Sequence, residues 1–160
     1  MATIKKIEDL EIWKMSRTLY QNVFQFVTRE AFSRDYKLTN QINGSSGSAM
    51  DNIADGFERG SRNEFIQFLG ISKGPAGEVK SQLYRAVDRK YITQDEFDIN
   101  YELAEKICKG CNGLMSYLNQ SEYKGEKFKH RVEEPEEFYL TLNKFTSEPD
   151  LKPQTSNLKL

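Results

Sequence analysis

Residues 93–120, TQDEFDINYELAEKICKGCNGLMSYLNQ, carry the clearest apolar period in this chain. Apolar side chains return every three or four positions, which places them on one face of a helix with 3.6 residues per turn. The stripe consists of Phe97, Tyr101, Ala104, Cys108, Cys111, Met115 and Leu118. Its heptad-like spacing is typical of a helix that packs lengthwise against other helices. Thr93 and Glu96 have the spacing of a capping box, which predicts where this helix begins.

Two earlier segments show the same period. One runs from about Glu8 to Thr28 and has two apolar stripes, so we expect a broadly buried helix. Its stripes are Leu10, Trp13, Tyr20, Phe24 and Val27, and Ile12, Met15, Leu19, Val23 and Phe26. The other runs from about Tyr36 to Phe57 and has small residues in its middle. Its predicted inward positions are Leu38, Ile42, Ser45, Ala49, Ile53 and Phe57.

A further helix is predicted to begin at a second capping-box pattern, formed by Ser61 and Glu64. Its apolar stripe comprises Phe65, Phe68, Ser72, Ala76, Val79, Leu83 and Ala86. Inside a helix, Pro75 removes one backbone N–H and its ring collides with the carbonyl of Ile71, at a cost of about 3 kcal/mol. The apolar phase nevertheless continues across the proline. We therefore predict one helix kinked near Gly74 and Pro75, with two shorter helices as the alternative.

Four amphipathic helices joined by short links predict an all-α, antiparallel up-and-down four-helix bundle over residues 1–120. Strand-like alternation is not evident. Beyond Gln120 the apolar pattern dissolves, and three of the four prolines fall in residues 121–160, which we assign to a C-terminal extension. Within it, Glu136 to Phe145 is predicted as one short helix that packs Phe138, Leu142 and Phe145 on the bundle. The last dozen residues have the composition of a flexible end.

Composition narrows the class of protein. A chain of 160 residues is long enough for one core, and its mean hydropathy of -0.71 is that of a polar surface. No apolar run approaches the ~18 residues that a membrane span requires, and residues 1–12 lack the continuous apolar segment of a secretion signal. The chain has only two cysteines. We therefore expect a cytoplasmic protein without a membrane association.

No residue cluster predicts catalysis, a metal or a cofactor. Cys108 and Cys111 are spaced as C-x-x-C but lack further zinc ligands and a strand–helix setting, so we interpret both as buried structural thiols. His130 is the only histidine, which excludes paired Glu-x-x-His ligands. Asp51 and Asp55 are interpreted as a solvated helix face. We therefore predict that the chain is not an enzyme.

Charge is unevenly distributed although the net charge is only -1. Residues 59–90 hold seven Lys and Arg against three carboxylates, a net charge of +4, whereas residues 91–120 hold two against five, a net charge of -3. The basic helix within residues 59–90 and the acidic helix within residues 91–120 either pair through their charges, or the basic helix keeps an exposed stripe that can bind phosphates. The candidate nucleic-acid-binding residues are Arg59, Arg62, Lys73, Lys80, Arg85 and Arg89.

Four motifs resemble a known family. They are DLEIWK at 9–14, NIADGFERGS at 52–61, EFIQFL at 64–69 and EVKSQL at 78–83. The segment from about residue 7 to residue 120 resembles the bacterial four-helix-bundle proteins named for intervening sequences in 23S ribosomal RNA genes. The resemblance implies a four-helix subunit that forms homopentameric rings, in a family of mostly undefined role. Similar proteins include the accessory factor of diversity-generating retroelements, which works with a reverse transcriptase and nucleic acid.

The chain also departs from that family. Where the family has two basic residues after a leucine of the second helix, this chain has Asn43 and Gly44 after Ile42, and Met50 replaces the usual proline. Arg59 and Arg62 match the family's junction. The leading hypothesis is a non-enzymatic homo-oligomer, a pentamer by resemblance, that contacts RNA or a nucleic-acid-processing protein. The alternative is a protein scaffold that self-associates through the small-residue face of the second helix and the apolar surface of the first.

Overall fold

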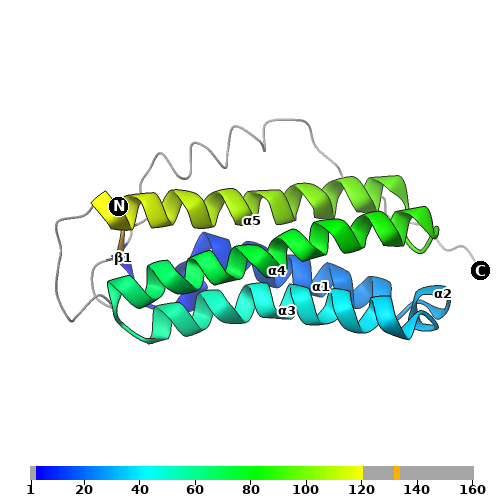
Figure 1. Ribbon diagram of the computed structural model, residues 1–160, viewed down its shortest axis with the longest axis horizontal. Helices are drawn as coiled ribbons and strands as arrows, with labels where there is room; N and C mark the ends of the chain where they lie inside the picture. Colours follow the sequence, from blue (N-terminus) through cyan, green and yellow to red (C-terminus); the bar gives the residue numbers. More distant parts are fainter. Residues whose placement is uncertain (1–2, 121–131, 134–160) are drawn as a thin grey trace, which may run out of the picture.

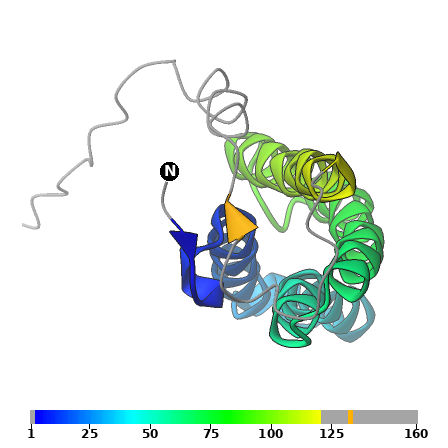
Figure 2. The ribbon, with the colours of Figure 1, turned by 90° about the vertical axis from the view of Figure 1, so that its left-hand side faces the viewer.

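The computed structural model describes residues 3–120 and 132–133 of the chain. Four long helices lie side by side along one axis, as Figure 1 shows. They are α1 (Glu11–Val27), α3 (Tyr36–Glu58), α4 (Arg62–Asp88) and α5 (Gln94–Gln120), with a 3₁₀ turn η1 (Ile7–Asp9) and a short α2 (Glu30–Ser33). Viewed end-on in Figure 2, the four helices surround one interior. The predicted all-α up-and-down bundle is confirmed.

The first helix begins later than predicted. Asp9 ends η1, and its carboxylate accepts hydrogen bonds from the backbone N–H groups of Lys5 and Lys6 at 3.1 and 3.2 Å. Leu10 then adopts extended backbone angles, so α1 starts only at Glu11. These local bonds satisfy N–H groups that a continuous helix would leave at its start without partners.

The prediction that this helix is broadly buried is wrong. Its buried residues are Ile12, Ser16, Leu19, Val23, Phe26 and Val27, which follow mainly the second predicted stripe. In the first stripe, Trp13 and Tyr20 are half-buried, and Phe24 is 55% exposed. A bundle helix packs on two neighbours and the shared interior, so its remaining face stays in water.

Helix α3 matches its prediction closely, since all six predicted inward residues are buried. Its small residues allow α4 to come near. A Cβ at Gly56 would lie only 2.5 Å from the Cβ of Phe68, and the Ser72 hydroxyl donates to the Ala49 carbonyl at 2.7 Å. Both contacts require side chains no larger than those present.

Helix α4 runs unbroken through Pro75. The alternative of two shorter helices is therefore wrong. Phe68 is half-buried instead of inward, and Leu69 occupies the core at that turn. The Ser61 hydroxyl accepts a hydrogen bond from the Glu64 backbone N–H at 3.5 Å, which confirms its capping role.

Helix α5 is rotated from its predicted orientation. Its buried face is centred on Ala104, Ile107, Cys111, Leu114 and Leu118, whereas Tyr101, Cys108 and Met115 are half-buried. The predicted stripe combined core positions with positions on the edge that faces α4. The capping box is confirmed: Glu96 N–H donates to the Thr93 hydroxyl at 3.2 Å, and Thr93 N–H donates to the Glu96 carboxylate at 2.9 Å.

A two-residue antiparallel ladder, absent from the sequence-based prediction, joins residues 3–4 to residues 132–133. Strand β1 (Thr3–Ile4) pairs with β2 (Val132–Glu133), with Thr3 opposite Glu133 and Ile4 opposite Val132. A strand of two residues is too short to show the alternation of apolar and polar residues by which a sequence predicts a strand. The predicted helix from Glu136 to Phe145 lies outside the described residues. Within the described part, no helix is both long and apolar enough to cross a membrane.

Candidate functional site

The six basic candidates lie along α4, at the turn before it and at its C-cap, Arg89. Lys80 and Arg85 are five residues apart, which at 3.6 residues per turn separates their directions by about 140°. Their contacts agree: Lys80 bonds to Glu105 of α5, and Arg85 bonds to Gln41 of α3. The predicted set is therefore not a single basic stripe.

The edge of α4 that faces α5 carries Lys80 and Lys73. The Lys80 ammonium lies 2.6 Å from a Glu105 oxygen and 5.7 Å from the ring centroid of Tyr101. The hydrogen bond between them raises the pKa of Lys80 and lowers that of Glu105. Lys73 is half-buried and has no carboxylate within ion-pair distance in residues 3–120. Lys80 is thus occupied inside the bundle, and Lys73 is not.

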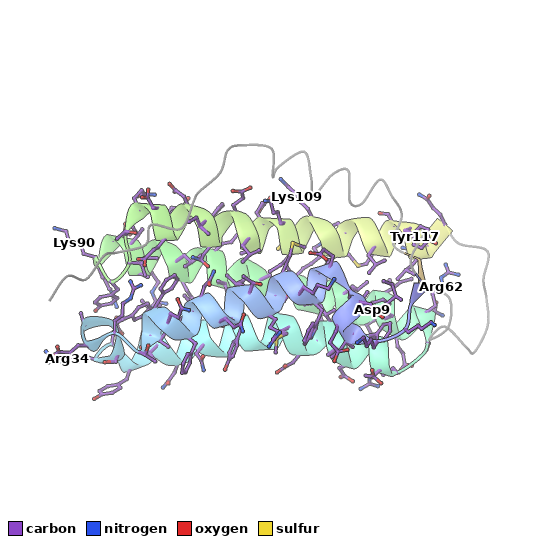
Figure 3. All side chains as sticks on the ribbon, turned by 180° about the vertical axis from the view of Figure 1, so that it is seen from behind. Asp9, Arg34, Arg62, Lys90, Lys109 and Tyr117 are labelled. Carbon is purple, nitrogen blue, oxygen red and sulfur yellow. The ribbon has the colours of Figure 1, made fainter. Side chains whose placement is uncertain are left out.

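Arg62 closes the end of the bundle. Its Nη2 donates to the backbone carbonyl of Asn119 at 3.1 Å, near the end of α5. Its Nε is buried without a hydrogen-bond partner in the described part of the chain. The last carbonyls of a helix have no N–H donor within their own helix, so a guanidinium that donates to one of them stabilises the helix end. Figure 3 shows Arg62 at the same end of the bundle as Tyr117.

On the other side, two arginines form ion pairs. Arg59 Nε lies 3.1 Å from Asp55, its Nη1 lies 3.2 Å from Glu64, and its guanidinium stacks 4.6 Å from the ring centroid of Phe68. Arg89 pairs with Asp35. The pKa of Asp35 is lowered by the Leu38 backbone N–H first and by Arg89 second.

Arg85 differs from these two arginines because its bond is to a neutral amide, the Gln41 side chain, at 2.8 Å. No carboxylate compensates its charge among the ion pairs of the described residues. Arg62, Arg85 and Lys73 are therefore the three candidates without a carboxylate partner in the described residues, and Arg62 is the one of them that binds a helix-end carbonyl. The partners of Lys80, Arg89 and Arg62 lie far away in the chain, so local sequence could not separate these residues from Arg85 and Lys73.

A partly exposed apolar row follows the outer face of α1. Trp13, Tyr20 and Phe24 fall within about 40° of one another at 100° per residue. The Tyr20 ring lies against α3, 3.6 Å from where a Cβ on Gly47 would be, while a Cβ on Gly44 would meet nothing within 4 Å. This α1–α3 face combines aromatic rings with a helix surface that lacks side chains.

A second aromatic group lies where α4 meets α5. The rings of Tyr84, Phe97 and Tyr101 contact one another with centroid distances of 4.7, 5.4 and 5.7 Å. Tyr84 is 52% exposed, whereas Phe97 is buried. These rings pack α4 against α5, and Tyr84 is the one of the three that is classed as exposed.

The cysteines differ in burial. Cys111 is fully buried, which raises the pKa of its thiol to about 12, and Cys108 is half-buried with a raised pKa for the same reason. The prediction of two buried thiols holds for Cys111 only. In residues 3–120 and 132–133, no three His, Cys, Asp or Glu side chains gather as a metal site. Asp51 and Asp55 are exposed on α3, and His130 lies outside the described residues.

Residues 8–113 match the family model of the 23S rRNA-intervening sequence protein. The chain belongs to this family. No curated protein was found to match the chain. The matched region contains α1, α3, α4 and most of α5, so the family model describes the bundle itself.

The motif NIADGFERGS at 52–61, one of those that resemble the 23S rRNA-intervening sequence proteins, builds the turn between α3 and α4. Gly56 allows Phe68 to approach, Asp55 holds Arg59, and Ser61 caps α4. Gly60 has a φ of 71°, a left-handed conformation that glycine adopts at little cost. These residues explain the motif through turn geometry, without a ligand.

Proposed function

We propose that this chain is a non-enzymatic helical module of the cytoplasm that works by binding protein chains, copies of itself first. The proposal is carried by a row of side chains on α1, of which Phe24 is exposed and Trp13 and Tyr20 are half-buried, with Tyr20 beside Gly47 of α3. Clustered apolar side chains on a soluble surface are characteristic of interaction sites, and helix positions without side chains let another helix approach closely. Free cysteines are consistent with a reducing compartment.

The contacts of the basic residues favour protein binding over phosphate binding. Four of the six candidates already bind carboxylates or a helix-end carbonyl within the chain. A phosphate would have to compete with those partners. The opposite charges of α4 and α5 therefore serve in part to hold the two helices together. Among the described residues, they do so through one α4–α5 ion pair, Lys80–Glu105.

The oligomer is tested by measuring its mass in solution at several concentrations, by sedimentation or light scattering. We expect a multiple of the 18.6 kDa subunit, with a pentamer as the specific proposal. Phe24→Asp should weaken assembly at least tenfold, because a charge would be buried in the contact. Ile71→Asp is the matched control, since Ile71 is 45% exposed but lies on α4. A monomer at all concentrations, or equal effects of both variants, would contradict the proposal.

A second function, contact with RNA or a ribonucleoprotein, is favoured by the family description alone. We propose Arg85 and Lys73 as its contacts, because neither has a carboxylate partner in the described residues and, unlike Arg62, neither binds a helix-end carbonyl. An oligomer would repeat both cations and raise a weak affinity through multivalency. A relation to the accessory factor of diversity-generating retroelements stays part of this proposal.

RNA binding should be measured at two salt concentrations, for which phosphate contacts predict marked weakening at the higher one. Arg85→Gln should reduce affinity and its salt dependence. Arg59→Gln removes the same charge from a residue that already binds Asp55 and Glu64, and should change affinity less. Absence of binding to any RNA at low salt would eliminate this second function and leave the first intact.

A further inference from the structure

Helix α5 has an exposed apolar residue bordered by carboxylates. Ile99 is 52% exposed, and the carboxylates of Asp95, Asp98 and Glu102, all within about one turn of it, are exposed as well. Glu102 pairs with Lys106 and Asp98 accepts a hydrogen bond from Gln94, whereas Asp95 has no partner in the described residues. We refer to Ile99, Asp95, Asp98 and Glu102 as the acidic α5 face.

The α1–α3 face has cations on either side of its exposed phenylalanine. Arg17 precedes Phe24 by seven residues and points within about 20° of it, and Lys37 has the same relation to Gly44 on α3. Arg17 and Lys37 are exposed and form no ion pair in the described residues. Asp51, the exposed carboxylate of α3 in this direction, lies seven residues beyond Gly44, away from the Phe24 end. The surface around Phe24 is therefore basic.

Both faces lie at the same level along the bundle. Figure 1 shows that α1 ends and α5 begins at the same end, near α2. There, Asn22 of α1 donates to Asn100 of α5 at 2.9 Å. Since α1 and α5 run antiparallel, this bond puts Phe24 and Ile99 within about 2 Å of each other along the bundle axis. A second copy placed side by side can therefore bring its Phe24 opposite Ile99 without a shift along the axis.

Each face is a poor partner for an identical face. A twofold contact brings the same patch of both copies together, so Arg17 would approach another Arg17. On the acidic α5 face, carboxylates would meet carboxylates. Like charges across a contact are unfavourable, whereas opposite charges speed association and fix the register of the partners. The charges therefore favour a contact between the two different faces.

Resting on the self-association proposed above, we propose that copies of this chain bind head to tail, the α1–α3 face of one on the acidic α5 face of the next. Phe24 packs on Ile99 of the next copy, which removes two exposed apolar side chains from water. Arg17 and Lys37 meet the carboxylates that border that Ile99. Because the faces lie at one level, successive contacts close into a ring and do not climb into a filament.

Two variants that each block one face test the proposal. Phe24→Asp and Ile99→Asp each bury a carboxylate in the contact, so each alone should assemble at least tenfold more weakly than the unmodified protein. Ile71→Asp is the matched control, because Ile71 is 45% exposed on α4, outside both faces. Circular dichroism should show the same folded bundle in all three variants. Sedimentation measures the assembly.

Mixing the two variants gives the decisive result. One intact face of each kind remains, so an equimolar mixture should form a one-to-one dimer with twice the mass of the 18.6 kDa subunit and grow no further. Assembly of the unmodified protein should also weaken as salt rises, because exposed charges are screened.

Three outcomes would overturn the head-to-tail contact while the proposed self-association stands. Ile99→Asp could assemble as the unmodified protein does, the mixture could stay monomeric at tenfold the concentration at which the unmodified protein assembles, or assembly could be indifferent to salt. An unmodified protein that is monomeric at every concentration would instead remove the proposed self-association itself. The two failures are thus distinguishable.

Discussion

Gly56 is the residue at which the bundle has least room. An alanine there would place its Cβ 2.5 Å from the Phe68 Cβ and 3.2 Å from the Phe65 ring, so α3 and α4 would have to move apart. We expect Gly56→Ala to lower the free energy of unfolding by about 1 to 3 kcal/mol, the usual cost of overpacking. Chemical denaturation measures this.

Gly44→Ala is the control for that substitution. Gly44 is also in the middle of α3, but a Cβ there meets nothing within 4 Å. Alanine should therefore raise the free energy of unfolding by about 0.5 to 1 kcal/mol through helix propensity. If both substitutions changed the free energy of unfolding in the same direction, the close contact of Gly56 with α4 would not be the reason why the two glycines differ.

Glu96 links stability to pH. Arg29 lowers the pKa of Glu96 to about 2 from its ordinary 4.5, with a further contribution from the Thr93 backbone N–H. A carboxylate whose pKa is depressed by folding stabilises the protein above its unfolded pKa, and that contribution is lost as pH falls from 4.5 toward 2. Water screens the partly exposed pair, so we expect roughly 1 kcal/mol.

Glu96→Gln should remove that part of the pH dependence. Its free energy of unfolding at pH 7 should fall by about 1 kcal/mol, and the difference from the unmodified protein should shrink on acidification below 4.5. Urea denaturation at several pH values measures both effects. A difference that grows at low pH would contradict the role assigned to the Arg29–Glu96 pair.

At the scale of one helix, α4 accepts a proline in its interior. Pro75 has no N–H for the carbonyl of Ile71, yet α4 continues because its apolar face keeps the same phase on both sides. Pro75→Ala should restore that hydrogen bond and raise the midpoint of thermal unfolding, with a gain of about 1 to 3 kcal/mol. A lower midpoint would mean that the proline's geometry is needed for packing.

The four helices differ in how well sequence alone predicted their orientation. In α3 every predicted inward residue is buried, because its polar and small positions alternate cleanly with apolar ones. In α1 and α5, apolar residues occupy more than one face, so periodicity could not choose between them. Packing against the neighbouring helices decided the orientation. In α5, Ile107 and Leu114 point inward, and Tyr101 and Cys108 lie on the edge that faces α4.

At the scale of the whole molecule, one continuous core joins all four long helices. We expect residues 3–120 to unfold in one cooperative transition, because no helix can leave without exposing buried side chains of its neighbours. Trp13 is the single tryptophan and packs beside that core. Its fluorescence and the far-ultraviolet circular dichroism should therefore change at the same denaturant concentration. An earlier fluorescence transition would show that α1 separates first.

The candidate site could be predicted less well than the fold. Local sequence identified Lys80 and Arg89 as cations, but could not show that Glu105 and Asp35 already bind them. It suggested an apolar first helix, but not that Phe24 would remain in water. Charge matching and exposure depend on which helices become neighbours, and that information is spread across the chain.

The amino-acid sequence by itself determined the helices, most of their ends and their assembly into an up-and-down bundle. Periodicity and caps act within a few residues, so a local reading is sufficient for them. Only the tertiary structure decided which face of α1 and α5 points inward, which cations keep an unmatched charge, and that residues 132–133 return to residues 3–4. Those outcomes arise from contacts between segments distant in sequence, where several arrangements satisfy the local pattern equally and packing selects one.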